Sequence, residues 1–122
     1  MLVAYASAGF AYATSPKATW AADPLSISFV AITGSGGSSD SVTCSQNISG
    51  PTLRTLISNP TRMSLTALPS SFSCNSSPTP VTFKAQCLVT AVMCRGTYHG
   101  LVQIRDGYRD IPANLNIVIT VT

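Results

Sequence analysis

Glutamate is absent from this chain of 122 residues, and charged residues make up only 9% of it. Four aspartates and one histidine are the remaining side chains suited to acid–base chemistry near neutral pH. General acid–base catalysis relies on such groups, so the composition disfavours most enzyme classes. We expect no catalytic residue and no cofactor. The strong helix formers Glu, Lys, Arg and Gln are scarce or missing, which also disfavours a helical fold.

What the sequence does contain favours a small β-rich domain. Hydrophobic residues account for 45% of the chain, and 17 Ser and 14 Thr supply small hydroxyl groups. A disordered chain would be poor in apolar residues and rich in charge, and the length suits one domain. The net charge of +3 comes from scattered cations rather than a basic patch. We therefore expect no nucleic-acid partner.

Four cysteines in so short a chain indicate two disulfides and an oxidising compartment, extracellular or at the cell surface. No Cys-x-x-Cys pair is present, so we expect no zinc site and no other metal. The number of cysteines alone leaves three pairings open. The cysteines are Cys44, Cys74, Cys87 and Cys94.

Two triplets match the acceptor pattern for N-linked sugars, Asn47-Ile48-Ser49 and Asn75-Ser76-Ser77. Both stand in turn-like surroundings, so Asn47 and Asn75 are candidate glycosylation sites. A chain rich in Ser and Thr also produces such triplets by chance.

Residues 1–23 are predicted to be an N-terminal extension and linker, followed by one domain over residues 24–122. Residues 1–13 resemble a weak signal peptide, but they lack a basic first part. We therefore expect them to belong to the mature protein. The apolar stretch is too short for a transmembrane helix, and no membrane span is expected.

From residue 24 onward, short alternating runs are separated by turn residues, as in an all-β sandwich. The last hairpin is the clearest, with alternating apolar residues on both sides of a turn at Asp106-Gly107. Stretches rich in Gly, Ser, Asn and Pro at 34–37, 47–51 and 69–80 are expected to be turns or loops. About seven antiparallel strands are predicted, at 25–29, 40–46, 52–57, 62–67, 81–87, 98–104 and 115–121.

The segment 96–104, followed by Ile111-Pro112 and 115–121, resembles the last two strands of immunoglobulin-like modules on microbial surface proteins, including BACON-type repeats. Residues 25–29 resemble the opening strand of such modules. The resemblance covers roughly residues 24–122 and implies an immunoglobulin-like β-sandwich, a surface location and no enzymatic activity. The four cysteines and the N-terminal extension depart from the pattern.

The resemblance also implies a ranking of the disulfide pairings. In an immunoglobulin-like sandwich, the second and fifth strands are neighbours in one sheet. Cys44 then approaches Cys74, and Cys87 and Cys94 flank the next connection. This pairing is favoured over the other two. All four cysteines are interpreted as structural staples.

The N-terminal segment, residues 2–14, is the feature that a plain sandwich does not need. Apolar or small residues occupy both faces of an extended form. We expect it to act as a donor strand that completes a sheet in a neighbouring copy. The alternatives are an extra strand on its own domain and a signal remnant. The predicted interface residues are Leu2, Val3, Tyr5, Phe10 and Tyr12.

Four further features have structural interpretations. His99 is expected at the surface, because it lies opposite the core-facing residues of its strand and no second histidine exists. The run from Asp106 to Asp110 is expected to be a hairpin turn with a local ion pair, since two carboxylates are too few for calcium.

Tyr98 is a candidate for the tyrosine corner of such sandwiches. Trp20 and Tyr12 lie outside the alternating core runs. For both residues, packing in an interface or in the core is favoured over a role in binding sugar.

These observations predict a structural subunit of an extracellular filament or pilus-like thread, built from copies of the chain and joined head to tail by N-terminal strand addition. One alternative is an adhesion or carbohydrate-binding module of a surface protein, with surface glycans as partners. Another is a virion decoration or coat-associated protein.

Overall fold

The computed structural model describes residues 17–107 and 109–122. Within these residues the regular structure is almost all β-strand, with one 3-10 turn, η2 (Ala31–Thr33), and one single-turn helix, α1 (Ala91–Cys94). The strands are β1 (Ala18–Trp20), β2 (Leu25–Phe29), β3 (Ser35–Cys44), β4 (Ile48–Ile57), β5 (Met63–Leu68), β6 (Ser71–Cys74), β7 (Thr79–Cys87), β8 (Gly96–Asp106) and β9 (Arg109–Val121).

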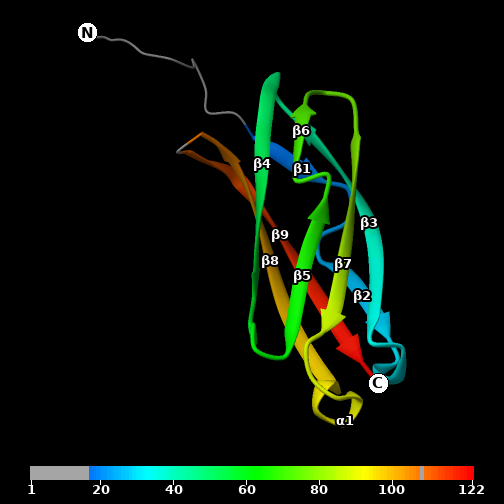
Figure 1. Ribbon diagram of the computed structural model, residues 1–122. Coiled ribbons are helices and arrows are strands. Elements are labelled where there is room, and N and C mark those ends of the chain that lie inside the picture. Colours follow the sequence, from blue (N-terminus) through cyan, green and yellow to red (C-terminus); the bar gives the residue numbers. More distant parts are fainter. Residues whose placement is uncertain (1–16, 108) are drawn as a thin grey trace, which may run out of the picture.

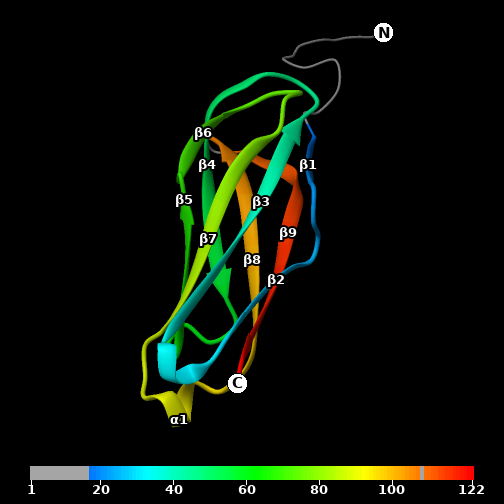
Figure 2. The ribbon, with the colours of Figure 1, turned by 90° about the vertical axis from the view of Figure 1, so that its right-hand side faces the viewer.

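The strands form two sheets that face each other across one core (Figures 1 and 2). The strand order is β1-β3-β7-β5 in the first sheet and β2-β9-β8-β4-β6 in the second. With β1 and β2 taken as two halves of a split first strand, this is the immunoglobulin order, ABED facing a sheet that contains CFG. The predicted all-β sandwich is confirmed. The likeness to BACON-type repeats in particular stays a prediction.

The number and direction of the strands differ in part from the prediction. Nine strands are present in the described residues rather than about seven, and β2 pairs with β9 in parallel. The other paired strands are antiparallel. The parallel pair arises because the first strand crosses from one sheet to the other between β1 and β2.

Three stretches expected to be turns or loops contain strand residues. The glycine-rich run 34–37 opens β3, residues 48–51 belong to β4, and the loop 69–80 contains β6. Pairing with neighbouring strands overrides the local turn propensity here. At Gly37 the pairing needs glycine, because an added Cβ would lie 2.7 Å from the backbone oxygen of Phe83 in β7.

The predicted extension and linker, residues 1–23, contain β1, and Trp20, which lies outside the predicted alternating runs, packs in the core. Ala18, Thr19 and Trp20 pair with Cys44, Thr43 and Val42 of β3 in the register of a regular antiparallel ladder. Ala18 and Trp20 are buried and Thr19 between them is exposed. The alternation is real, but three residues are too few to reveal it in the sequence.

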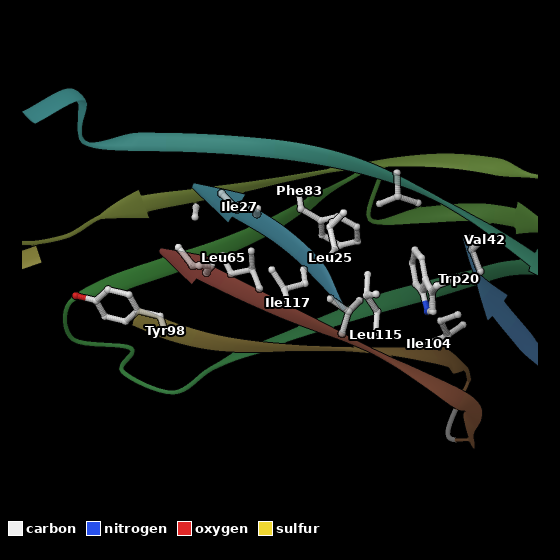
Figure 3. Packing of buried hydrophobic residues seen from close by; sticks show 14 of the residues in the cluster. Trp20, Leu25, Ile27, Val42, Leu65, Phe83, Tyr98, Ile104, Leu115 and Ile117 are labelled. Carbon is white, nitrogen blue, oxygen red and sulfur yellow. The ribbon is translucent and has the colours of Figure 1, made fainter. Parts of the chain in front are cut away.

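The core lies between the sheets and contains the apolar residues of the predicted alternating runs (Figure 3). Tyr98, on β8, is also buried and lies toward one end of the core. Gly100 allows the sheets to approach closely, because a Cβ there would meet Leu65 at 2.7 Å. The buried residues of β2, β7 and β9 are Leu25, Ile27, Val81, Phe83, Ala85, Ile111, Leu115, Ile117, Ile119 and Val121.

The sandwich is elongated and has two distinct ends (Figures 1 and 2). We call the end where the described chain begins the entry end; it holds Lys17, the β3–β4 turn and β6. We call the opposite one the far end; it holds η2, α1 and the C-terminal residue Thr122. Backbone hydrogen bonds from Ala31 N to Thr122 O and from Cys87 N to Gly34 O tie the far end together.

Candidate functional site

The predicted interface residues Leu2, Val3, Tyr5, Phe10 and Tyr12 lie outside the described residues. The structure does show where the chain that follows them joins the sandwich. Lys17 N donates to Ser45 Oγ at 2.9 Å, and Ser45 N donates to Lys17 O at 2.8 Å. The described chain therefore joins the sandwich at its entry end, held through both the backbone N–H and the backbone C=O of Lys17.

Strand β1, which continues from this point, is fastened to both sheets. The indole nitrogen of Trp20 donates to Ala113 O of β9 at 3.2 Å, and the Trp20 ring lies 5.8 Å from that of Phe83. The buried carboxylate of Asp40 accepts hydrogen bonds from Ala22 N at 2.9 Å and Ser41 N at 2.8 Å. These contacts hold β1 and the residues directly after it in place on the sandwich.

A disulfide at the entry end joins the two sheets. Cys44 of β3 is bonded to Cys74 of β6, with their Cα atoms 5.5 Å apart. Cys44 N also donates to Asn75 O at 2.7 Å. This pairing, together with Cys87–Cys94 at the far end, is the one that the immunoglobulin-like resemblance implied. No cysteine of the described residues is free.

The two candidate glycosylation sites line one open cavity at the entry end. The cavity has a volume of about 220 Å³ and lies where β4 pairs with β6. Asn47 is exposed, whereas Asn75 is half-buried and accepts a hydrogen bond from Ser77 N through Oδ1. Attachment of sugar at either position stays a prediction. The residues that line the cavity are Asn47, Ile48, Ser49, Ser73, Cys74 and Asn75.

The far end carries a group of exposed apolar side chains that the sequence reasoning missed. Seven large hydrophobic residues are exposed in the described chain, and five of them flank η2 or α1. Ile32 is 84% exposed and Val92 77%. We call these five residues the apolar cap: Val30, Ile32, Leu88, Val92 and Met93. The two elements are in contact with each other, so the five residues of the cap share one end of the sandwich.

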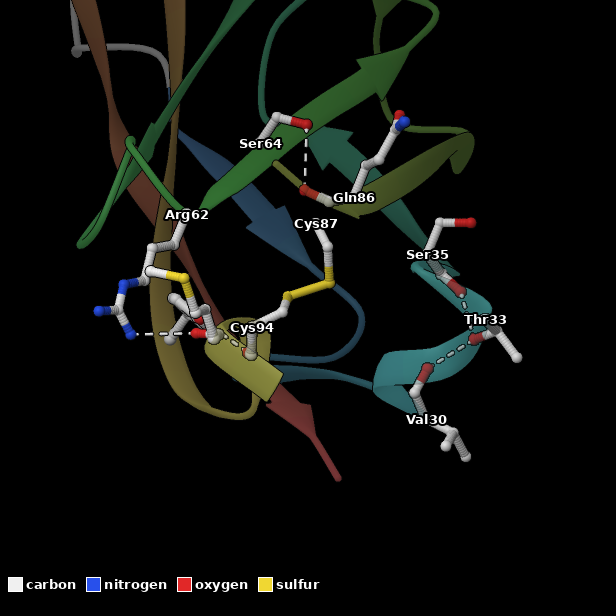
Figure 4. The surroundings of a disulfide bond; sticks show 10 residues. Val30, Thr33, Ser35, Arg62, Ser64, Gln86, Cys87 and Cys94 are labelled. Atoms are coloured by element: carbon white, nitrogen blue, oxygen red, sulfur yellow. Dashed lines mark hydrogen bonds between the residues drawn. A yellow bond between two sulfur atoms is a disulfide. The ribbon is translucent and has the colours of Figure 1, made fainter. Parts of the chain in front are cut away.

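The backbone beneath the cap is held by covalent and polar bonds (Figure 4). The Cys87–Cys94 disulfide closes the loop that carries α1, and the Tyr98 hydroxyl donates to Cys94 O at 2.7 Å. This bond to the backbone a few residues upstream is the tyrosine-corner geometry expected for Tyr98. The Arg62 guanidinium donates to Met93 O at 3.0 Å. The backbone of the loop that carries α1 and its exposed apolar side chains is therefore held in place.

The cap had a weak signal in the sequence. Four apolar residues, Leu88, Val89, Val92 and Met93, lie between two disulfide-bonded cysteines in a connection where polar turn residues are usual. In a strand pattern, such residues are interpreted as core. Only the structure shows that three of the four are exposed.

The remaining candidate residues form no further site. His99 is exposed on β8 as expected. Arg105 Nε and Asp110 Oδ1 form an ion pair, 3.2 Å apart, next to the β8–β9 turn. In the described part of the chain, no group of three or more His, Cys, Asp or Glu side chains lies close enough together to hold a metal ion. Nor does any helix there have the length and apolar character needed to cross a membrane.

No protein-family model and no curated protein sequence matches this chain. Among solved structures, domains 4 and 5 of the S-layer protein SbsC are similar at 10% identity, with a TM-score of 0.48 over 87% of this chain and 51% of that one. A family 123 glycoside hydrolase from Clostridium perfringens is similar at 9% identity, with a TM-score of 0.47 over 88% of this chain and 27% of that one.

The periplasmic chaperone SfaE is similar at 8% identity, with a TM-score of 0.43 over 86% of this chain and 57% of that one. The chain thus spans about half or less of the S-layer fragment and the hydrolase, and somewhat more than half of the chaperone.

Proposed function

We propose that this protein is a structural subunit of an extracellular filament or thread, and that copies of it join head to tail by strand addition of the N-terminal segment. The observation that carries the proposal is that the sandwich needs no strand from residues 1–16. The strands that make up both sheets of the immunoglobulin order all lie between Ala18 and Val121. The apolar, uncharged segment that precedes them is therefore available to a neighbour.

The geometry of attachment supports an open assembly. The segment joins the sandwich at the entry end, where Lys17 and β1 are firmly held. A contact between this end and a different surface of a second copy is heterologous, and such contacts do not close unless the rotation between copies permits a ring. The sheet order leaves β5 and β6 as outer strands at one edge of the sandwich. Strand addition would supply backbone hydrogen bonds at such an edge.

The compartment proposed for this role is extracellular. Two disulfides persist in an oxidising environment and stabilise small domains there. The exposed faces of the strands are rich in Ser and Thr rather than charge, which suits a packed array of identical subunits better than a freely diffusing protein. Sugars attached at Asn47 or Asn75 would add to the polar surface at the entry end. The proposal assigns the chain no catalytic role.

A carbohydrate-binding module is the less favoured alternative. Sugars stack on exposed aromatic rings, but the aromatic side chains of the described residues are buried or half-buried. Trp20, which the sequence placed outside the core, is among the buried ones. No observation favours a virion component over a filament.

The test is the mass of the assembly formed by the intact chain and by residues 17–122 alone. Light scattering across a concentration series and negative-stain imaging would follow both proteins, and circular dichroism would check that both are folded. We expect the intact chain to form threads whose mass rises with concentration, and the shortened chain to stay monomeric. An intact chain that remains monomeric at high concentration would refute the proposal.

A further inference from the structure

The apolar cap is a feature of the described surface that the fold itself does not explain. Isolated exposed aliphatic residues are common, but a contiguous apolar patch on a soluble domain marks an interaction site. Here five such residues share one end, and a disulfide and the Tyr98 hydroxyl bond hold the α1 part of the backbone in place. A surface built in this way is preorganised to receive an apolar partner.

We propose that the apolar cap is the acceptor surface for the N-terminal segment of a second copy of this chain. This inference rests on the proposed function and names the surface that the segment meets. The segment supplies Leu2, Val3, Tyr5, Phe10 and Tyr12 and carries no charged side chain. Its burial against Val30, Ile32, Leu88, Val92 and Met93 would remove apolar surface on both partners from water.

The length of the sandwich lies between Lys17, where the N-terminal segment ends, and the cap of the same copy. Strand β3 starts directly after η2 and ends at Cys44, which pairs with Ala18. Its ten residues span about 30 Å. Phe10 lies seven positions before Lys17 and can extend about 25 Å from it at most. Tyr12, five positions away, can extend about 18 Å. An extended backbone therefore leaves the Tyr12 ring short of the cap of its own domain and brings the Phe10 ring at most to its edge, whereas Leu2, Val3 and Tyr5 lie 12 to 15 positions before Lys17 and can span that distance.

A neighbour stacked end to end has no such limit, because its far end can lie directly beside the entry end of the first copy. The segment then needs to bridge only the junction between two sandwiches. Each copy uses its entry end as donor and its far end as acceptor, and the contact repeats without closing. Strand β6 and α1 lie at opposite ends of the sandwich (Figures 1 and 2), so repeated contacts between the entry end of one copy and the far end of the next would build a filament in which all copies point the same way.

The first test changes the cap in the full-length chain. Ile32→Asp and Val92→Asp place a charge on the cap at positions 84% and 77% exposed, where the fold tolerates polar residues. Leu68→Asp tests the other candidate acceptor, the edge of β5, since Leu68 is 73% exposed and lies at the opposite end of β5 from Met63, which pairs with Cys87. We expect each cap variant to raise the dissociation constant between copies at least about tenfold.

If the cap is the acceptor, Leu68→Asp assembles like the unmodified chain. In residues 17–122, which lack the segment, all three substitutions should leave the midpoint of thermal unfolding unchanged. If the unmodified chain forms threads and both cap variants form them equally well, the cap is not the acceptor and the proposed function stands. If only Leu68→Asp loses assembly, the acceptor is the edge of β5. If the unmodified chain is monomeric, the proposed function itself fails and the acceptor proposal fails with it.

The second test separates donor from acceptor by mixing. The Ile32→Asp/Val92→Asp chain keeps its N-terminal segment but lacks a competent cap. Residues 17–122 include all nine strands and the cap but lack the segment. We expect each to be monomeric alone and the two to form a one-to-one complex when mixed, which cannot grow further. Absence of that complex, with the shortened chain shown to be folded, would overturn the inference.

Discussion

Replacement of Trp20 tests whether β1 is part of the sandwich core. The indole is only 6% exposed, contacts the Phe83 ring and donates to Ala113 O of the opposite sheet. Trp20→Ala removes both contacts and leaves a cavity. Truncation of a buried tryptophan typically costs about 3 to 5 kcal/mol of unfolding free energy. We expect a loss in that range.

The assay is reversible unfolding in urea under oxidising conditions, followed by circular dichroism. For a domain of this size the urea m value is about 1.5 kcal/mol/M. A loss of about 3 to 5 kcal/mol then lowers the midpoint by roughly 2 to 3 M. Trp20→Phe keeps a ring beside Phe83 but removes the hydrogen bond to Ala113 O. We expect it to cost about 1 to 2 kcal/mol.

Leu68→Ala is the matched control, because it also shortens a large apolar side chain but at a position 73% exposed and outside the cap. Its free energy of unfolding is expected to stay within about 0.5 kcal/mol of the unmodified protein. The reasoning would be refuted if Trp20→Ala were as stable as the control. In that case β1 would not be packed as described.

Three further changes probe the framework around the two ends. Joint replacement of Cys44 and Cys74 by Ala opens a link across a sequence separation of 30 and should cost roughly 3 to 4 kcal/mol; an unchanged urea midpoint would contradict this. Tyr98→Phe removes the bond to Cys94 O and should cost about 1 to 2 kcal/mol in thermal unfolding; full stability would show that the bond contributes nothing. Gly37→Ala places a Cβ 2.7 Å from a backbone oxygen of β7 and should cost about 1 to 3 kcal/mol; calorimetry showing an equal or higher melting temperature would rule out the close approach.

Much of the fold could be predicted from hydrophobic alternation. The runs 25–29, 81–87 and 115–121 are strands in the structure, with the expected residues buried. Alternation is informative in these runs because one face of each strand packs on the core and the other meets water. The class of fold followed from the number and spacing of such runs.

The errors occur where neighbouring strands decide the local structure. The glycines at 34–37 predict a turn, but β3 uses Gly37 to bring its backbone close to β7. Trp20 belongs to a strand of only three residues, which is too short for a period to be recognised. The cap could not be predicted either, because apolar residues such as Val92 and Met93 are interpreted as core until a structure shows that they face outward.

The most direct test of the central claim is to find what the N-terminal segment of one copy contacts. A photoreactive phenylalanine analogue at position 10, in a mixture of isotopically light and heavy chains, would identify the partner residues by mass spectrometry. We predict cross-links between different copies, at residues 30–32 or 88–93. Cross-links confined to the same chain, or directed to another surface of the neighbouring copy, would contradict the account.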